Sequence, residues 1–316
     1  MPLLEPHNPP LPAFAVPPVP EAGRPLARPS DLRRGALAMI GSALLFAAMS
    51  AAVKAAAATL PNAMVVFFRN AVALALLLPW LLRRGPGALR TRRVGGHLVR
   101  GLGGLAAMYC FFYAIAHMRL ADAVLLNYSL PLLLPFVERA WLREPIPARL
   151  WPPLGVGFAG ILIILRPGSA LFEPAALVAL ASAGFAAVAQ VSIRELTASE
   201  PVTRIVFYFS LIATLASSLP LLGTWTAPSP AAWLALVAAG AFAVLGQFLL
   251  TRAYACAPAG RVGPFLYTGV VFSGLLDWLI WGRLPDSLFV LGATAVSASA
   301  ILALRLRTPA VVPALD

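Results

Sequence analysis

Three ionisable residues lie inside long apolar stretches of the chain, where they could do chemistry that the surrounding side chains cannot. Lys54, the only lysine, ends the stretch FAAMSAAVK, Arg69 lies in VVFFRN, and Asp277 lies in VVFSGLLDWL. Charged groups in such surroundings are costly, and they are candidates for functional sites by default. Together they could form a charge cluster with one spare cation, able to hold a carboxylate or a phosphate.

Lys54, Arg69 and a further acid, Glu138, also have purely structural explanations. A lysine can extend its ammonium group to the boundary between lipid and water, and Arg69 can donate hydrogen bonds to backbone carbonyls. Glu138 lies next to Arg139 and near Arg143, so it can form a solvated ion pair at the end of an apolar stretch. Both explanations stay open at this point.

A second group of candidates consists mainly of tyrosines and amides within the same apolar stretches. Such side chains line cavities that bind amphipathic organic solutes, because they stack and form hydrogen bonds. The structural alternative is that they form hydrogen bonds between membrane helices. The candidates for a cavity lining are Arg69, Tyr109, Tyr113, Asn127, Tyr128, Gln190, Tyr208, Gln247 and Tyr267.

The composition indicates that membrane helices must position these residues. Hydrophobic residues make up 60% of the 316 positions and charged residues 11%, whereas soluble domains are roughly half apolar and about a quarter charged. A net charge of +12 would suggest nucleic acid as a partner of a soluble protein. Here the arginines lie in short gaps between apolar runs, so no nucleic acid is expected. Cys110 and Cys256 show no metal-ligand spacing, and neither a metal nor a cofactor is expected.

Ten stretches are long enough to span a bilayer, which takes about 20 apolar residues. The predicted fold class is therefore an all-α integral membrane protein with ten transmembrane helices. We expect the spans at 36–58, 62–82, 97–118, 120–141, 148–166, 174–196, 202–222, 231–255, 260–282 and 286–305. The proline-rich residues 1–30 are expected to form a disordered tail, and residues 308–316 a second tail.

The arginines are divided unevenly between alternate connections. Eighteen fall in the tails and connections of one side, and three (Arg119, Arg166 and Arg283) fall on the other. Because cytoplasmic loops carry an excess of basic residues, both termini are predicted to be cytoplasmic.

The two halves of the sequence, 31–168 and 169–307, match at an offset of 139 or 140 residues. The matches are FAAMSAAVK with FAAVAQVSI, VVFFRN with IVFYFS, WLREP with WGRLP, Tyr128 with Tyr267, and Glu138 with Asp277. Since each half holds five spans, an odd number, the second half must enter the membrane inverted. Inverted repeats of this kind build alternating-access transporters with a substrate site between the halves.

Over about residues 36–307 the chain resembles the drug/metabolite transporter superfamily with two EamA-type domains. The resemblance rests on FFRN, LVRGLGGLAAMYCFFYAIAHMRLADA, the proline of NYSLP, WLREP and GFAGILIILRPG. It looks especially like the branch that includes bacterial S-adenosylmethionine and related metabolite carriers. The resemblance implies ten helices around a central cavity, in a bacterial cytoplasmic membrane, that move small organic solutes of amino-acid or nucleoside type. In such a carrier Lys54 with Asp277, and Glu138 at the other end, could form gates.

A membrane-embedded enzyme and a channel-like protein are the alternatives. The sequence contains no G-x-S-x-G, H-E-x-x-H or P-loop motif, so an enzyme is not expected. Apart from the lipid bilayer and a small organic solute, a homodimer through spans five and ten is a further hypothesis, because glycines in span five allow close helix contact. The identity of the solute, the direction of transport and its energy coupling stay open.

Overall fold

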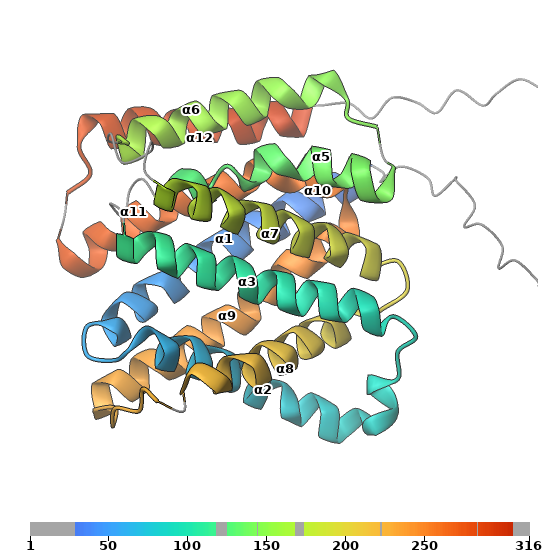
Figure 1. Ribbon diagram of the computed structural model, residues 1–316. Coiled ribbons are helices and arrows are strands. Elements are labelled where there is room, and N and C mark those ends of the chain that lie inside the picture. The colour runs from blue at the N-terminus through green and yellow to red at the C-terminus, as the bar shows by residue number, and fades with distance from the viewer. Residues whose placement is uncertain are drawn as a thin grey trace, which may run out of the picture.

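The computed structural model describes residues 29–117, 125–143, 145–167, 174–221, 223–282 and 284–305. Helices account for all the regular structure in these residues, and no strand occurs among them. The long helices lie side by side in one bundle (Figure 1). The predicted tails, 1–30 and 308–316, fall almost wholly outside the described residues.

The first half contains α1 (Pro29–Ala57), α2 (Asn62–Arg84), the 3-10 helix η1 (Pro86–Leu89), α3 (Val94–His117), α5 (Leu130–Leu142), η2 (Ala148–Leu150) and α6 (Trp151–Leu165). The second half contains α7 (Pro174–Leu196), α8 (Val202–Leu221), α9 (Pro230–Cys256), α10 (Ala259–Val262), η4 (Gly263–Tyr267), α11 (Thr268–Trp281) and α12 (Ser287–Arg305).

Within the described residues, eight helical stretches are long and apolar enough to cross a membrane. They coincide with eight of the ten predicted spans. The other two, 97–118 and 120–141, both run into residues 118–124, which lie outside the described part. Of their described residues, α3 covers 97–117, and a helical segment at 125–127, a turn at 128–129 and α5 cover 125–141. The all-α membrane fold is confirmed, and the count of ten helices stays a prediction.

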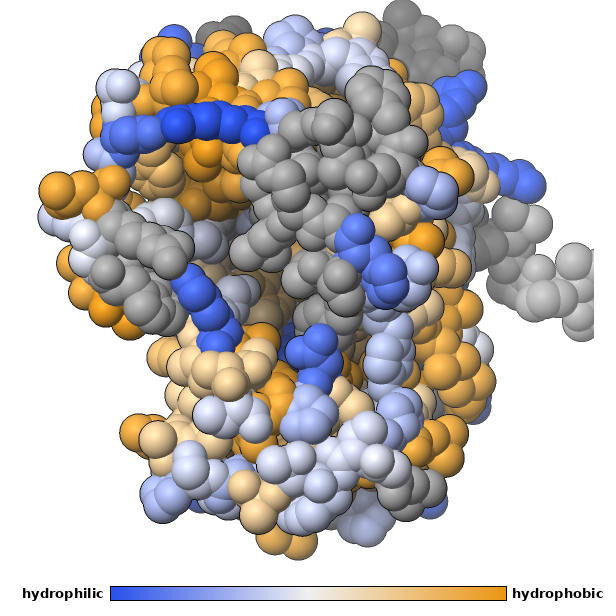
Figure 2. Space-filling model, turned by 60° about the vertical axis from the view of Figure 1, so that its left-hand side comes forward, coloured by the Kyte–Doolittle hydropathy of each residue, from blue (hydrophilic) through white to orange (hydrophobic). Residues whose placement is uncertain are grey.

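The outer surface of the bundle is largely apolar. Hydrophobic residues, shown in orange, cover much of the surface seen in Figure 2. The side chains of Leu82, Leu219 and Leu284 are each more than two thirds exposed. Such an area would be unfavourable in water. It is the surface that lipid chains would cover.

Helices of the two halves pack on each other in a symmetric pattern. The first helix of the first half, α1, packs on α9 of the second half. The first helix of the second half, α7, packs in the same way on α3 of the first half. In addition α2 packs on α8, and α6 packs on α12. Much of the core therefore lies between the two halves, as two interlocking repeats require.

Span nine is interrupted, so the prediction of a single helix over 260–282 is wrong. It consists of α10, η4 and α11, and Pro264 sits at the start of η4, where its missing N–H is tolerated. In the first half, a turn at Tyr128 and Ser129 separates a helical segment at 125–127 from α5. Tyr128 and Tyr267, which match at an offset of 139, thus both stand just before the second helical piece of an interrupted span.

Contacts between connections join segments that the arginine count predicts to lie on the same side of the membrane. On the arginine-rich side, Arg93 pairs with Glu195 at 3.0 Å. On the other side, the Arg166 guanidinium contacts the Asp286 carboxylate, and the Met64 sulfur lies 3.1 Å from the backbone nitrogen of Thr226. The side that faces the cytoplasm stays a prediction of the arginine count.

The helices α5 and α11 both end on a residue with a positive φ, 58° at Arg143 and 70° at Gly282. Glycine adopts this conformation freely, but other residues do so at a cost of about 1 kcal/mol. We therefore expect Arg143→Gly to raise the melting temperature of the purified protein by roughly 2–4 °C. Gly282→Ala should lower it by a similar amount. Thermal unfolding in detergent measures both, and shifts of the same sign would contradict the explanation.

Candidate functional site

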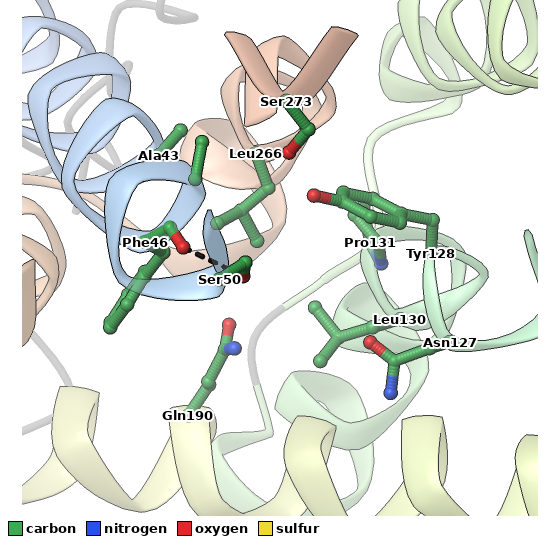
Figure 3. A pocket seen from close by; sticks show the side chains of 11 residues that line it. Ala43, Phe46, Ser50, Asn127, Tyr128, Leu130, Pro131, Gln190, Leu266 and Ser273 are labelled. Atoms are coloured by element: carbon green, nitrogen blue, oxygen red, sulfur yellow. Dashed lines mark hydrogen bonds between the residues drawn. The ribbon is translucent and has the colours of Figure 1, made fainter. Parts of the chain in front are cut away.

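A cavity of about 150 Å³ lies between α1, α5, α7 and the η4–α11 segment, so both halves contribute to its wall (Figure 3). The polar part of the lining consists of Ser50, Asn127, Tyr128, Gln190 and Ser273. The apolar part consists of Ala43, Phe46, Ala47, Leu130, Pro131 and Leu266.

The α1 wall comes from the stretch FAAMSAAVK. Phe46, Ala47 and Ser50 face the cavity together because residues three and four apart share one face of a helix. The Ser50 hydroxyl donates a hydrogen bond to the Phe46 carbonyl at 2.8 Å (Figure 3). Ser50 and Ser273 are not among the predicted cavity residues, although a lone hydroxyl on the face of an apolar helix is a signal for each.

The opposite wall is formed at the interruption before α5. The Asn127 amide donates to the Ser182 hydroxyl at 2.9 Å, and Ser182 in turn donates to the Ala107 carbonyl at 2.8 Å. These bonds fix the orientation of the amide. In Figure 3 the Tyr128 hydroxyl and the Ser273 side chain point to the same part of the cavity.

Gln190 enters from α7 and supplies an amide to the cavity (Figure 3). Its Oε1 accepts a hydrogen bond from the hydroxyl of Tyr254, a fully buried residue. Because this oxygen is engaged, the NH₂ group is the part of Gln190 best able to donate to a bound molecule.

The lining suits the binding of polar organic molecules. It combines two amides, three hydroxyls and the rings of Phe46 and Tyr128, which suits hydrogen bonding and stacking. Of the side-chain types that serve as general acids and bases, namely His, Glu, Asp, Lys, Tyr and Cys, the lining contains one, Tyr128.

Three predicted cavity residues, Asn127, Tyr128 and Gln190, are brought together in this way. The other predicted ones lie outside the lining. Tyr113 is about half exposed, and its ring stacks on the His117 ring, with 3.9 Å between the ring centres. The Tyr208 hydroxyl donates to the Leu89 carbonyl at 2.8 Å.

The remaining two predicted tyrosines are Tyr109 and Tyr267. Tyr267 is fully buried, and its ring fills the space beside Gly157 of α6. The hydroxyls of Tyr109 and Tyr267 are buried without a hydrogen-bond partner among the described residues. A role of either in binding stays a prediction.

Arg69 lies in the interior of the bundle, only 7% exposed. Its guanidinium donates to the sulfur of Met49 at 3.1 Å and to the Asn70 side-chain oxygen at 3.1 Å. Thioether sulfur is a weak acceptor, and within the described residues no carboxylate pairs with Arg69. The predicted role of Arg69 in holding an anion stays a prediction.

Arg100 is a buried cation that is not among the predicted site residues. It is 4% exposed, its Nη2 donates to the Gln247 Oε1 at 2.7 Å, and its guanidinium lies 4.0 Å from the centre of the Phe209 ring. A lone arginine inside predicted span 97–118 was the signal for it. Gln247, a predicted cavity residue, thus serves as the partner of Arg100.

The predicted gate residues differ in their surroundings. Lys54 is exposed, and the side chain of Asp277 lies outside the described part of the structure, so their pairing stays a prediction. Glu138 is buried, not solvated as the ion-pair explanation expects. Its carboxylate accepts hydrogen bonds from the backbone N–H groups of Gly260, at 2.7 Å, and of Ala259. It therefore ties α5 of the first half to α10 of the second.

Comparison with known proteins finds one family model that matches the chain twice. A model of the EamA-like transporter family matches residues 33–166 and 173–305. The pseudopaline exporter CntI of Pseudomonas aeruginosa is 38% identical over 272 residues, which cover 85% of this chain and 95% of that protein. The riboflavin transporter of Vibrio cholerae is 30% identical over 84% of this chain and 91% of its own length.

More distant similarities extend the same picture. An S-adenosylmethionine uptake transporter of Rickettsia bellii is 26% identical over 73% of this chain and 80% of that protein. A solved crystal structure with 22% identity superposes with a TM-score of 0.74, over 85% of this chain and 96% of that one. This last similarity shows the fold.

Proposed function

Since the chain belongs to the EamA-like transporter family, we propose that it carries a small amphipathic organic solute across the cytoplasmic membrane by alternating access. The named relatives are transporters of organic metabolites and not enzymes. The proposed solute is of amino-acid or nucleoside type. The observation that carries the proposal is the cavity between the two halves, whose lining combines amides, hydroxyls and aromatic rings.

The size of the cavity supports a small solute or a partly closed state. Sites for drug-sized ligands usually measure about 300–1,000 Å³, whereas this cavity measures about 150 Å³. A solute as large as a nucleoside would fit once the halves separate further, which is the motion that alternating access requires. We propose Glu138 as part of the gate at the arginine-rich end, and Lys54 with Asp277 at the other.

A ligand screen tests the proposed solute class directly. Purified protein is unfolded by heat in the presence of amino acids, nucleotides, S-adenosylmethionine, flavins and polyamines in turn. A ligand that binds only the folded state raises the melting temperature. Proteoliposomes then test the best ligand for saturable uptake that is stimulated from the opposite side. Flux without saturation would favour a channel, and conversion of the ligand without flux would favour an enzyme.

Tyr128 and Tyr267 offer a matched pair for testing the site, because they occupy equivalent positions in the two repeats. Tyr128→Phe removes only a hydroxyl that faces the cavity, and we expect kcat/KM for uptake to fall about tenfold, the effect of one hydrogen bond. Tyr267→Phe removes a hydroxyl outside the cavity, and uptake should stay within twofold of the original. Equal losses in the two variants would show that the cavity is not the binding site.

A further inference from the structure

A second hollow, of about 730 Å³, lies at the arginine-rich end of the bundle. The hollow lies between two connections, the one that joins α2 to α3 and the one that joins α7 to α8. Both connections lie at the same end of the bundle in Figure 1. Four arginines line it, Arg90, Arg92, Arg93 and Arg204. We call it the arginine groove. It shares no lining residue with the cavity described above.

The walls of the arginine groove are held together by Glu200. Its carboxylate accepts hydrogen bonds from the Thr91 hydroxyl and from Arg204, each at 2.5 Å. Arg204 also donates from Nε to the Ala88 carbonyl at 2.7 Å. The two connections are therefore fixed relative to each other, and the groove is formed before any ligand arrives.

The charges in the groove are not balanced. Burial by itself would raise the pKa of Glu200. Hydrogen bonds from Thr91 and Arg204 and the positive charge of Arg204 lower the pKa more than burial raises it, so it lies below its usual value. Glu200 is thus ionised at neutral pH and compensates one arginine. Arg93 pairs with Glu195 outside the groove. Within the described residues, the side chains of Arg90 and Arg92 form no hydrogen bond or ion pair, so two guanidiniums remain for an anionic ligand.

The surroundings of the groove favour a lipid over a soluble ligand. Val94 and Leu98, in the first turns of α3 directly after Arg93, are about half exposed. Apolar side chains beside a basic groove match a molecule that carries both acyl chains and a negative headgroup. Basic pockets between helices at the cytoplasmic end of membrane proteins bind such headgroups.

We propose that the arginine groove binds the phosphate of an anionic phospholipid, with Arg90 and Arg92 as its principal ligands. Guanidinium groups pair with phosphate through short, charge-assisted hydrogen bonds. The lipid would brace the two connections that Glu200 joins. The site does not depend on which solute the protein carries.

Thermal unfolding of the detergent-purified full chain tests the proposal. The protein is titrated with a short-chain phosphatidylglycerol, with phosphatidylcholine of the same chain length, and with glycerol phosphate. We expect phosphatidylglycerol to raise the melting temperature by several degrees more than phosphatidylcholine does. The double variant Arg90→Gln/Arg92→Gln should weaken the apparent affinity for phosphatidylglycerol about thirtyfold. This is the combined loss expected when two arginines each make the usual contribution of a basic residue near an anionic lipid surface.

The matched control is Arg83→Gln/Arg84→Gln, which removes two exposed arginines near the same connection but outside the groove. It should change the affinity less than threefold. An equal loss in the two double variants would overturn the site, because it would reflect net charge alone. An equal response to glycerol phosphate and phosphatidylglycerol would overturn the lipid assignment in favour of a soluble phosphate compound.

Discussion

Glu138→Ala is expected to lower the free energy of unfolding by about 3 kcal/mol or more and to reduce transport at least tenfold. The substitution leaves the buried backbone N–H groups of Ala259 and Gly260 without the carboxylate they contact. Each buried polar group that loses its partner costs about 1–3 kcal/mol. Because Glu138 ties α5 to α10, its loss should also loosen one end of the contact between the halves, where we propose a gate.

Two further variants separate this explanation from a general effect of charge. Glu138→Gln keeps the volume and one acceptor oxygen, so it should lose about half as much stability as the alanine variant. Glu195→Ala removes a carboxylate whose pairing with Arg93 is partly exposed, and such pairs are usually worth less than about 1 kcal/mol. Thermal unfolding and proteoliposome uptake measure all three variants. If Glu195→Ala were as harmful as Glu138→Ala, the proposed tie would be refuted.

Gly160→Leu is expected to prevent the protein from folding. A Cβ atom at Gly160 would lie 2.7 Å from the carbonyl oxygen of Gly292, and 3.0 Å from side-chain atoms of Ala295 and Val296. Backbone atoms cannot turn away as a flexible side chain can, so α6 and α12 would have to separate. Gly160→Ala, a smaller intrusion, should cost about 1–3 kcal/mol.

Gly155 on the same helix supplies the matched control. A Cβ atom at Gly155 would meet nothing within 4 Å, and alanine is a better helix former than glycine by about 1 kcal/mol. Gly155→Ala should therefore leave the melting temperature unchanged or raise it, and Gly155→Leu should still give folded protein. Size-exclusion chromatography of the detergent-solubilised variants reports the folded fraction. Similar losses at positions 155 and 160 would mean that the close approach of α6 and α12 is not what excludes a side chain at Gly160.

The sequence by itself determined the membrane class, the positions of most spans, the repeat and the family. These properties follow from composition, from the length of apolar runs and from similarity at a fixed offset, all of which can be read along the chain. The sequence also indicated Asn127, Tyr128 and Gln190 as binding candidates. It could not rank them above six other polar residues of the same kind, because a polar side chain in a span serves equally well for packing or for binding.

Only the tertiary structure decided which of these side chains share a cavity. Tyr128 and Tyr267 are equivalent in the repeat, yet one lines the cavity and the other packs against Gly157. Glu138 and Arg100 find their partners, Gly260 and Gln247, more than a hundred residues away. Such pairings depend on how each helix is rotated about its axis and where it is interrupted. Packing between the halves sets both, and no local pattern of residues records them.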